Sequence, residues 1–287
     1  MINILITGAN SYVGTSFAAW LSQWPDKYHI DTISMYGNDW RSRSFAGYDA
    51  VFHVAGIAHR TASASMKDMY FAVNRDLAVW TATKAKTEGV KQFVFMSSMM
   101  VYGLGARGEE QTITRDTVPS PSDIYGQSKL DAETVIEKME DDNFAVSVLR
   151  APIIYGPGCR GNFPKLLKIA GFAIFSPNIP NRRSMIYIDN FCEFVRVVID
   201  CRSGGILFPQ DKEYVSTIEV IKEYRKIINK RTLMVPFPKC LSRKLMCFNK
   251  FNNAFRSSVY AKEISENNSY QSVDFLTGLR RIATKTK

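Results

Sequence analysis

The feature that most constrains the fold is an apolar strand pattern that runs through a glycine turn into a helix pattern. Residues Ile2–Thr7 are mostly β-branched and predict a strand, and Tyr12–Trp24 places apolar side chains at helical spacing. Between them, Gly8 permits a tight turn and Gly14 allows the helix to pack closely on the strand. The positive end of such a helix faces the turn, so the segment predicts an anion site that suits a pyrophosphate.

The rest of the first two thirds repeats this alternation of short apolar runs and longer helical patterns. Parallel sheets built from βαβ units have this order, so the fold class is α/β, a Rossmann-type doubly wound parallel sheet. The pattern loosens after Pro152, which suggests a Rossmann domain over 1–158 and a small substrate-binding cap over 159–287. Some cap segments could return to the main sheet, and the tail from about 205 reads as irregular and basic apart from a helix near 216–229. The predicted strands are 30–35, 49–54, 93–97 and 145–150, and the predicted helices are 66–89, 128–139 and 190–201.

Charge and cysteine content narrow the possible partners and location. The net charge of +10 and the pI near 9.3 favour an anionic partner: nucleic acid, an anionic membrane surface or a phosphorylated small molecule. No nucleic-acid motif, membrane span or leader pattern is present, so a phosphorylated substrate and the cytoplasm are expected. The scattered cysteines argue against a disulfide framework, and the small number of histidines argues against a metal site.

A tyrosine and a lysine are spaced for acid–base chemistry. Tyr125 and Lys129 are four residues apart, so on a helix they lie on one face. An ammonium near a phenol favours the phenolate and lowers the tyrosine pKa from about 10. Tyr125 is therefore a candidate acid or base toward a hydroxyl or ketone, although this spacing is common by chance.

The glycine segment resembles the TGxxGxxG fingerprint of extended short-chain dehydrogenases/reductases, in the branch of nucleotide-sugar epimerases, dehydratases and reductases. The chain departs from it at the middle glycine, where it has Ser11. The resemblance implies NAD. NADP is the alternative, because no acidic residue ends the second strand to bind the ribose hydroxyls of NAD, and Arg41 and Arg43, which follow that strand, could receive the 2′-phosphate of NADP. The cofactor-binding residues implied by this and the following motifs are Gly8, Asn10, Ser11, Tyr12, Val13, Gly14, Asp49, Ala50, Val54, Ala55, Gly56, Asn74, Tyr125, Lys129 and Pro152.

Further segments are similar to motifs of the same family. Residues 97–103 resemble its SSxxVYG segment, which assigns Ser98 as the hydroxyl beside the reacting oxygen and completes a Ser98/Tyr125/Lys129 triad. Residues 49–56 resemble DxVxHxAA, in which His53 is read as a structural strand residue, and 149–158 resemble LRxxxxYGPG. In the cap, Asn162 and Arg183 lie in segments similar to nucleotide-sugar sites, and they join Ser98 and Tyr125 as implied substrate-binding residues.

The resemblance implies a nucleotide-sugar 4-epimerase that oxidises C4 transiently, with a reductase of a nucleotide-linked 4-keto sugar as the alternative. A dehydratase is disfavoured because Met99 and Met100 stand where that group carries acidic residues. A catalytically silent sensor of nicotinamide is disfavoured by the complete triad. By analogy with the family we also expect a homodimer.

Overall fold

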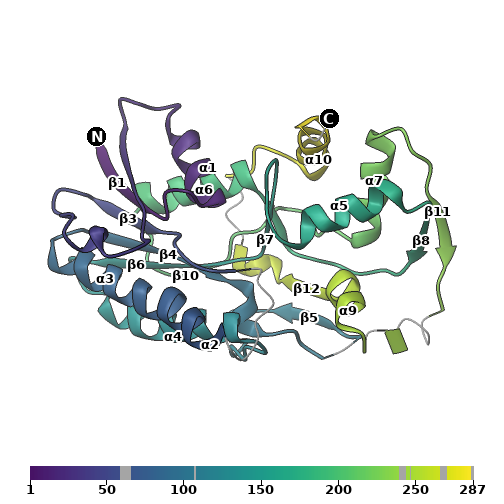
Figure 1. Cartoon of the computed structure of the whole chain (residues 1–287), viewed down its shortest axis with the longest axis horizontal. Coiled ribbons are helices and arrows are strands. Elements are labelled where there is room, and N and C mark those ends of the chain that lie inside the picture. The colour runs from purple at the N-terminus through teal and green to yellow at the C-terminus, as the bar shows by residue number, and fades with distance from the viewer. Residues whose placement is uncertain (59–65, 107, 239–243, 246, 266–269, 286–287) are drawn as a thin grey trace. The chain divides into compact units, whose positions relative to one another are not determined.

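The computed structural model describes residues 1–287 except 59–65, 107, 239–243, 246, 266–269 and 286–287 (Figure 1). The chain forms two compact units, which are described separately below. Unit 1 comprises Met1–Gly103, Pro119–Ala151 and Phe191–Pro209, and unit 2 comprises Leu104–Val118, Pro152–Asn190 and Gln210–Lys287.

Unit 1 is built on a six-stranded sheet with the order β10-β6-β4-β3-β1-β2. Every neighbouring pair is parallel, so the carboxyl ends of all six strands lie at one edge, and the predicted fold class is confirmed. The strands are β1 (Ile2–Thr7), β2 (Tyr28–Ile33), β3 (Ala50–His53), β4 (Gln92–Ser98), β6 (Ala145–Ala151) and β10 (Gly205–Leu207).

Helices cover both faces of this sheet (Figure 1). The face toward α3 and α4 is packed with alanines of these helices, such as Ala82 and Ala132, against strand residues that include Val51, Phe93 and Val148. On the other face, Phe17 of α1 meets Phe52 edge-on with ring centroids 5.2 Å apart. The helices are α1 (Tyr12–Leu21), α2 (Lys67–Tyr70), α3 (Leu77–Thr87), α4 (Ile124–Ile136) and α6 (Ile188–Asp200), and a π-helical segment, Phe71–Asp76, joins α2 to α3.

The segment that carries most of α6 and all of β10 belongs to unit 1, although it follows a long stretch of unit 2 in the sequence. Strand β10 pairs with β6, and α6 is fixed to the start of β2 because Asp200 accepts hydrogen bonds from Lys27 and Tyr28. The units therefore interleave along the chain, and a single cut at residue 158 describes them only coarsely. Strand β10, which follows α6, lies in the main sheet.

Unit 2 contains three two-stranded parallel sheets and helices of its own within the described residues. The expectation of an irregular tail is wrong, because the described part of 205–285 is largely helix and strand; the helix expected near 216–229 is α7. Its elements are β5 (Glu110–Ile113), β7 (Ile153–Tyr155), α5 (Asn162–Phe172), β8 (Phe175–Asn178), β9 (Met185–Tyr187), α7 (Thr217–Ile227), β11 (Leu233–Pro236), α9 (Asn249–Phe255), β12 (Ser257–Tyr260) and α10 (Phe275–Lys285).

Helix α4 begins four residues before the predicted start at Ser128. Asp123 caps it, accepting a hydrogen bond from the backbone N–H of Gly126 at 2.7 Å. The cap brings Tyr125 into the first turn, on the same helix as Lys129.

Candidate active site

The glycine turn after β1 lies against the end of β3. Gly8 has φ of +85°, a conformation that L side chains rarely adopt, and a Cβ there would lie 3.0 Å from the backbone nitrogen of Ala55. Asn10 is exposed in the same turn, and Tyr12 and Val13 open helix α1. The turn therefore presents the amino-terminal end of a helix at the carboxyl edge of the sheet, which fits the pyrophosphate of a dinucleotide.

Ser11 occupies the position where the fingerprint has its middle glycine, and it acts as the N-cap of α1. Its Oγ accepts a hydrogen bond from the N–H of Gly14 at 3.0 Å. Gly14 is itself required by packing, because a Cβ there would lie 2.7 Å from Ser11 Oγ and 3.1 Å from Val54 Cγ2. The serine thus satisfies one of the N–H groups that a helix leaves without an intrahelical partner.

Asn74 fixes the backbone at the end of β3. The side chain is buried in the π-helical segment, where its Oδ1 accepts from Ile57 N at 2.8 Å and its Nδ2 donates to Ile57 O at 3.1 Å. The same Nδ2 donates to Ser128 Oγ on α4. Asn74 therefore holds the loop after Gly56 against the helix that carries Tyr125 and Lys129, as a positioning residue.

His53 is a structural residue of β3. It is buried beside Phe93 and Phe95, and its Nδ1 shares a hydrogen bond of 2.9 Å with Thr7 Oγ1 on β1. Burial, with the nearby charge of Lys129, lowers the pKa of His53 to about 3. The imidazole is therefore neutral at physiological pH.

The three residues of the predicted triad lie together at the carboxyl edge of the sheet. Ser98 ends β4, and its side chain lies close enough to Tyr125 on α4 to lower the pKa of that tyrosine. Lys129 donates to the carbonyl of Met96, also on β4, at 2.8 Å. A Cβ on Gly56 would lie 3.4 Å from Lys129 Nζ, so the lysine borders the loop that follows β3.

Burial dominates the electrostatics of this cluster. It raises the pKa of Tyr125 to about 12, against the lowering effect of the Ser98 side chain. It also lowers the pKa of Lys129 to about 8, which Glu133 opposes. Burial thus raises the tyrosine pKa, whereas the spacing from Lys129 predicts a lowered one, and the Lys129 ammonium donates to a backbone carbonyl.

A buried polar network beneath the triad was not predicted from the sequence. Glu133 on α4 accepts from Ser97 Oγ and from Arg150 Nη2, the latter at 2.7 Å, and Arg150 Nη1 donates to the Tyr102 hydroxyl at 2.6 Å. The side chains of Glu133 and Arg150 are only 1% and 6% exposed. The signal available in the sequence was the position of Glu133, one turn after Lys129.

Two residues expected at the cofactor site lie elsewhere. Asp49 and Ala50 are at the amino end of β3, where Asp49 Oδ2 accepts from Asn3 N at 3.0 Å and Lys91 lies 3.4 Å from Oδ1. Ala50 pairs with Ile4 in the sheet, whereas the glycine turn follows Thr7. Asp49 and Ala50 therefore lie at the edge of the sheet opposite the glycine turn and the triad, which are at the carboxyl ends of the strands.

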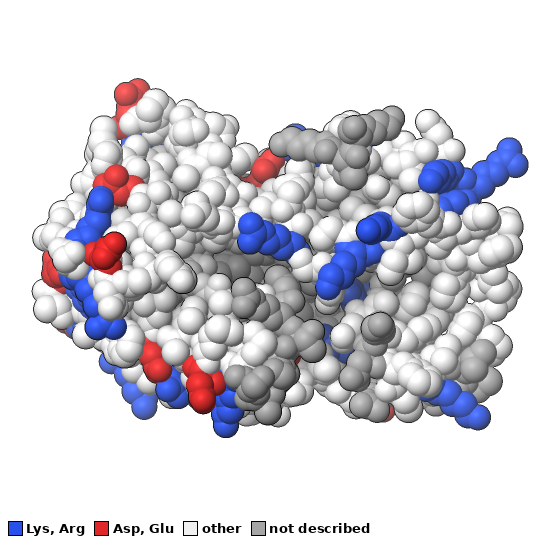
Figure 2. Space-filling view, in the orientation of Figure 1, with Lys and Arg blue, Asp and Glu red and all other residues white. Residues whose placement is uncertain are grey.

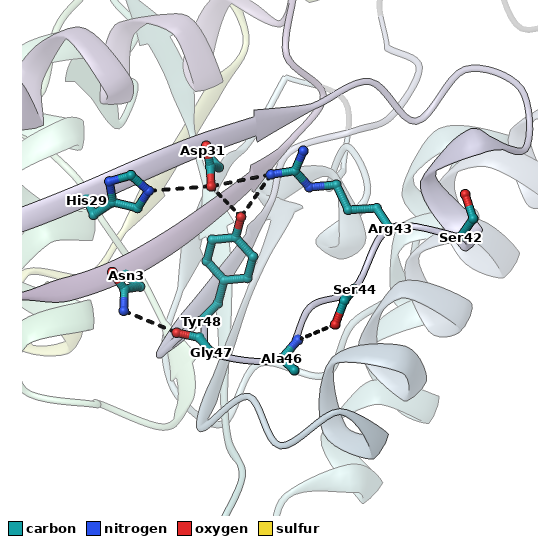
Figure 3. A pocket seen from close by; sticks show the side chains of 9 residues that line it. All are labelled: Asn3, His29, Asp31, Ser42, Arg43, Ser44, Ala46, Gly47 and Tyr48. Atoms are coloured by element: carbon teal, nitrogen blue, oxygen red, sulfur yellow. Dashed lines mark hydrogen bonds and ion pairs between the residues drawn. The ribbon is translucent and has the colours of Figure 1, made fainter.

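The arginines considered for a 2′-phosphate have other partners. Arg43 donates to the Tyr48 hydroxyl at 3.0 Å and lies 3.3 Å from Asp31 (Figure 3). The hydrogen bond from Tyr48, together with the charge of Arg43, holds the pKa of Asp31 below its usual value. Arg41 stacks on Trp80, 4.9 Å from the ring centroid.

The side chains around Arg43 line an open pocket of about 590 Å³ beside the edge strand β2. His29 and Asn3 also line it, and none of the triad or glycine-turn residues does. The pocket is therefore distinct from the candidate active site.

The remaining predicted residues belong to unit 2. Pro152 lies between β6 and β7, and Asn162 is the exposed first residue of α5. Arg183 donates from Nε to the carbonyl of Arg256 at 3.2 Å and from Nη2 to the carbonyl of Asn253. Burial, with the like charge of Arg256, lowers the pKa of Arg183 to about 10. The guanidinium is thus anchored to backbone of its own unit.

Comparison with known proteins shows the family to which the chain belongs. Residues 4–205 match the NAD-dependent epimerase/dehydratase family, which is more than half of the chain. The chain belongs to that family.

Two relatives in the epimerase/dehydratase family are 4-epimerases by name. A UDP-glucose 4-epimerase of Vibrio cholerae is 28% identical over 279 residues, covering 89% of this chain and 83% of that protein. An N-acetyl-α-D-glucosaminyl-diphospho-ditrans,octacis-undecaprenol 4-epimerase of Escherichia coli O157:H7 is 27% identical over 257 residues, covering 82% and 76%. The resemblance to nucleotide-sugar epimerases is thereby confirmed.

Solved structures agree with the epimerase/dehydratase fold. UDP-glucuronic acid 4-epimerase from Bacillus cereus in complex with NAD has a TM-score of 0.76 at 19% identity, covering 99% of this chain and 96% of that one. RMD from Pseudomonas aeruginosa complexed with NADPH has a TM-score of 0.76 at 17% identity, covering 99% of both chains. Structures of this fold thus hold either nicotinamide cofactor.

Proposed function

We propose that this chain is an NAD-dependent 4-epimerase of a diphosphate-linked sugar, acting by transient oxidation at C4. The observation that carries the proposal is the cluster of Ser98, Tyr125 and Lys129 at the edge of the sheet where the glycine turn opens. Relatives that are 4-epimerases by name, aligned over 89% and 82% of this chain, support the same assignment.

A bound nicotinamide cofactor would supply the hydride acceptor and donor. Tyr125 would remove the proton of the C4 hydroxyl and return one to the C4 oxygen after the 4-keto sugar has turned over. Ser98 would hold that oxygen by a hydrogen bond. Because burial raises the pKa of Tyr125 to about 12, Tyr125 rests as a phenol and requires a nearby positive charge to act as a base.

The residues after Ser98 favour epimerisation over dehydration. Met99 and Met100 begin the short 3₁₀ helix Met99–Tyr102, and neither can donate or accept a proton. A sugar dehydratase needs an acid and a base to eliminate water. The segment therefore supports a reaction that needs only one proton-transferring group and a hydride carrier.

The cofactor separates the epimerase from the alternative, a reductase of a 4-keto sugar. The protein is purified without added cofactor, and the denatured supernatant is assayed for NAD(H) and NADP(H). Stoichiometric NAD is expected, because an epimerase regenerates its cofactor in every turnover. An empty protein that binds NADPH from solution would support the reductase, and failure to bind either cofactor at millimolar concentration would refute both assignments.

The substrate is tested with two classes of sugar donor. UDP-glucose and UDP-N-acetylglucosamine represent the nucleotide-linked class, and N-acetylglucosaminyl diphosphate on a polyprenol represents the lipid-linked class. Epimerisation at C4 of any of them supports the proposal, and absence of turnover with all of them contradicts it. We further propose a homodimer, by family analogy, and a cytoplasmic location, which the unbridged thiols of Cys159, Cys201 and Cys247 support.

A further inference from the structure

Unit 2 carries an exposed apolar face at the end of α5 and on the ribbon formed by β8 and β11. Strands β8 and β11 are parallel neighbours, with Leu233 opposite Phe175 and Val235 opposite Pro177 (Figure 1). Paired residues in a parallel ribbon point to the same side. We call the following exposed residues the α5–β8–β11 face: Ile169, Phe172, Ile174, Phe175, Leu233 and Val235.

Packing within unit 2 does not account for this face. The opposite side of the ribbon packs on α7 and includes Ser176, which is buried. By contrast, Phe172 is 78% exposed and Phe175 is 64% exposed. Contiguous exposed apolar side chains on a soluble protein mark an interaction surface.

Basic residues surround the α5–β8–β11 face. Lys165 and Lys168 lie on the exposed side of α5, and Lys230 lies 5.7 Å from the ring centroid of Phe172. Neither 143–188 nor 224–262 contains an aspartate or a glutamate, although both contain several lysines and arginines. Figure 2 shows blue and almost no red over the region of α5, β8 and β11.

Apolar and aromatic side chains bordered by lysines fit one partner best, the surface of an anionic lipid bilayer. The apolar groups enter the boundary between headgroups and acyl chains, and the lysine stems extend so that their ammonium groups reach the phosphates. A protein partner would not require that the charged residues around the α5–β8–β11 face all be basic. Among the described residues, no helix is long and apolar enough to cross a membrane.

We propose that the α5–β8–β11 face binds the surface of an anionic membrane. This binding is separate from the catalytic function and is measured without any sugar substrate. It would place the enzyme beside lipid-bound material while leaving the protein peripheral and releasable by salt.

The test is co-sedimentation of the full chain with two kinds of vesicle, pure phosphatidylcholine and equal parts of phosphatidylcholine and phosphatidylglycerol. We expect binding to the anionic vesicles that weakens at high salt. The Lys165→Gln/Lys168→Gln variant should partition about 25-fold less, because each basic residue near an anionic leaflet contributes roughly fivefold. The Phe172→Ser/Phe175→Ser variant should lose binding, whereas Val118→Ser, which changes a side chain 79% exposed elsewhere on unit 2, should bind like the wild type.

A second readout covers the case in which the double serine variant fails to fold. Phe172→Trp keeps an aromatic side chain, and its emission should shift to the blue when anionic vesicles are added. Wild-type protein that stays in the supernatant with anionic vesicles overturns the proposal. So does a wild-type dimer in sedimentation velocity that Phe172→Ser/Phe175→Ser converts to monomer, if vesicles are not bound, because a second copy then covers the face.

Discussion

Replacing Glu133 by glutamine should both destabilise unit 1 and change the pH dependence of catalysis. The amide keeps the shape of the side chain, but it leaves the guanidinium of Arg150 buried without a countercharge. Breaking a buried ion pair in this way costs about 3–5 kcal/mol. Since about 1 kcal/mol corresponds to roughly 2–4 °C in a chain of this size, Tm should fall by on the order of 10 °C.

The catalytic consequence follows from Lys129. Glu133 raises the pKa of that lysine against the lowering effect of burial, which brings it to about 8. Without the carboxylate, the pKa of Lys129 falls further, so the ammonium is lost at lower pH. The alkaline limb of kcat/KM should therefore move to lower pH in Glu133→Gln.

Denaturant unfolding and the pH profile of kcat/KM measure the two effects. Glu110→Gln is the matched control, because it makes the same change in an ion pair with Arg182 that is 31% and 57% exposed, and it should cost less than about 1 kcal/mol. The reasoning is refuted if both variants lose the same stability and the alkaline limb of Glu133→Gln stays where it is in the wild type.

Three further predictions concern the same region. Tyr125→Phe should lower kcat by about 10²–10⁴-fold while leaving the stoichiometry of bound NAD unchanged; full activity would remove the tyrosine from the mechanism. In the wild type, kcat/KM should decline as the pH rises through about 8, because Lys129 loses its ammonium there; a flat profile to pH 10 would contradict that role. Gly126→Ala should cost about 1–3 kcal/mol in thermal unfolding, because its Cβ would lie 2.4 Å from the Met100 carbonyl oxygen, whereas Gly171→Ala on α5 meets nothing within 4 Å and should not destabilise.

The sheet and the position of the triad residues could be predicted because both follow from short sequence patterns and from the order of the strands along the chain. Strands such as β1 and β4 are short apolar runs, and in a parallel sheet their carboxyl ends must meet at one edge. That rule alone brings Ser98 to the edge that holds Gly8. The same rule places Asp49, which precedes its strand, at the other edge.

Other features depend on contacts that no local pattern contains. The raised pKa of Tyr125 follows from its burial, and the Lys129 ammonium donates to Met96; helical spacing specifies neither. Strand β11 joins β8 across more than fifty residues of sequence, so the order in the last third could not be read from periodicity. In the sequence, Ser11 stands where the fingerprint has a glycine. Only the structure shows that its Oγ accepts a hydrogen bond from Gly14 N and so caps α1.

The late return of β10 to the sheet sets the order in which the nascent chain can mature. Until residues 205–207 have left the ribosome, the outer edge of β6 exposes unpaired backbone, and the face beneath α6 lacks its cover. Residues of unit 2 are therefore synthesised after β6 and before the β10 strand that pairs with it. A protein cut after residue 158 would keep every fingerprint of cofactor binding and still present an open sheet edge to its neighbours, so it should aggregate rather than behave as an independent domain.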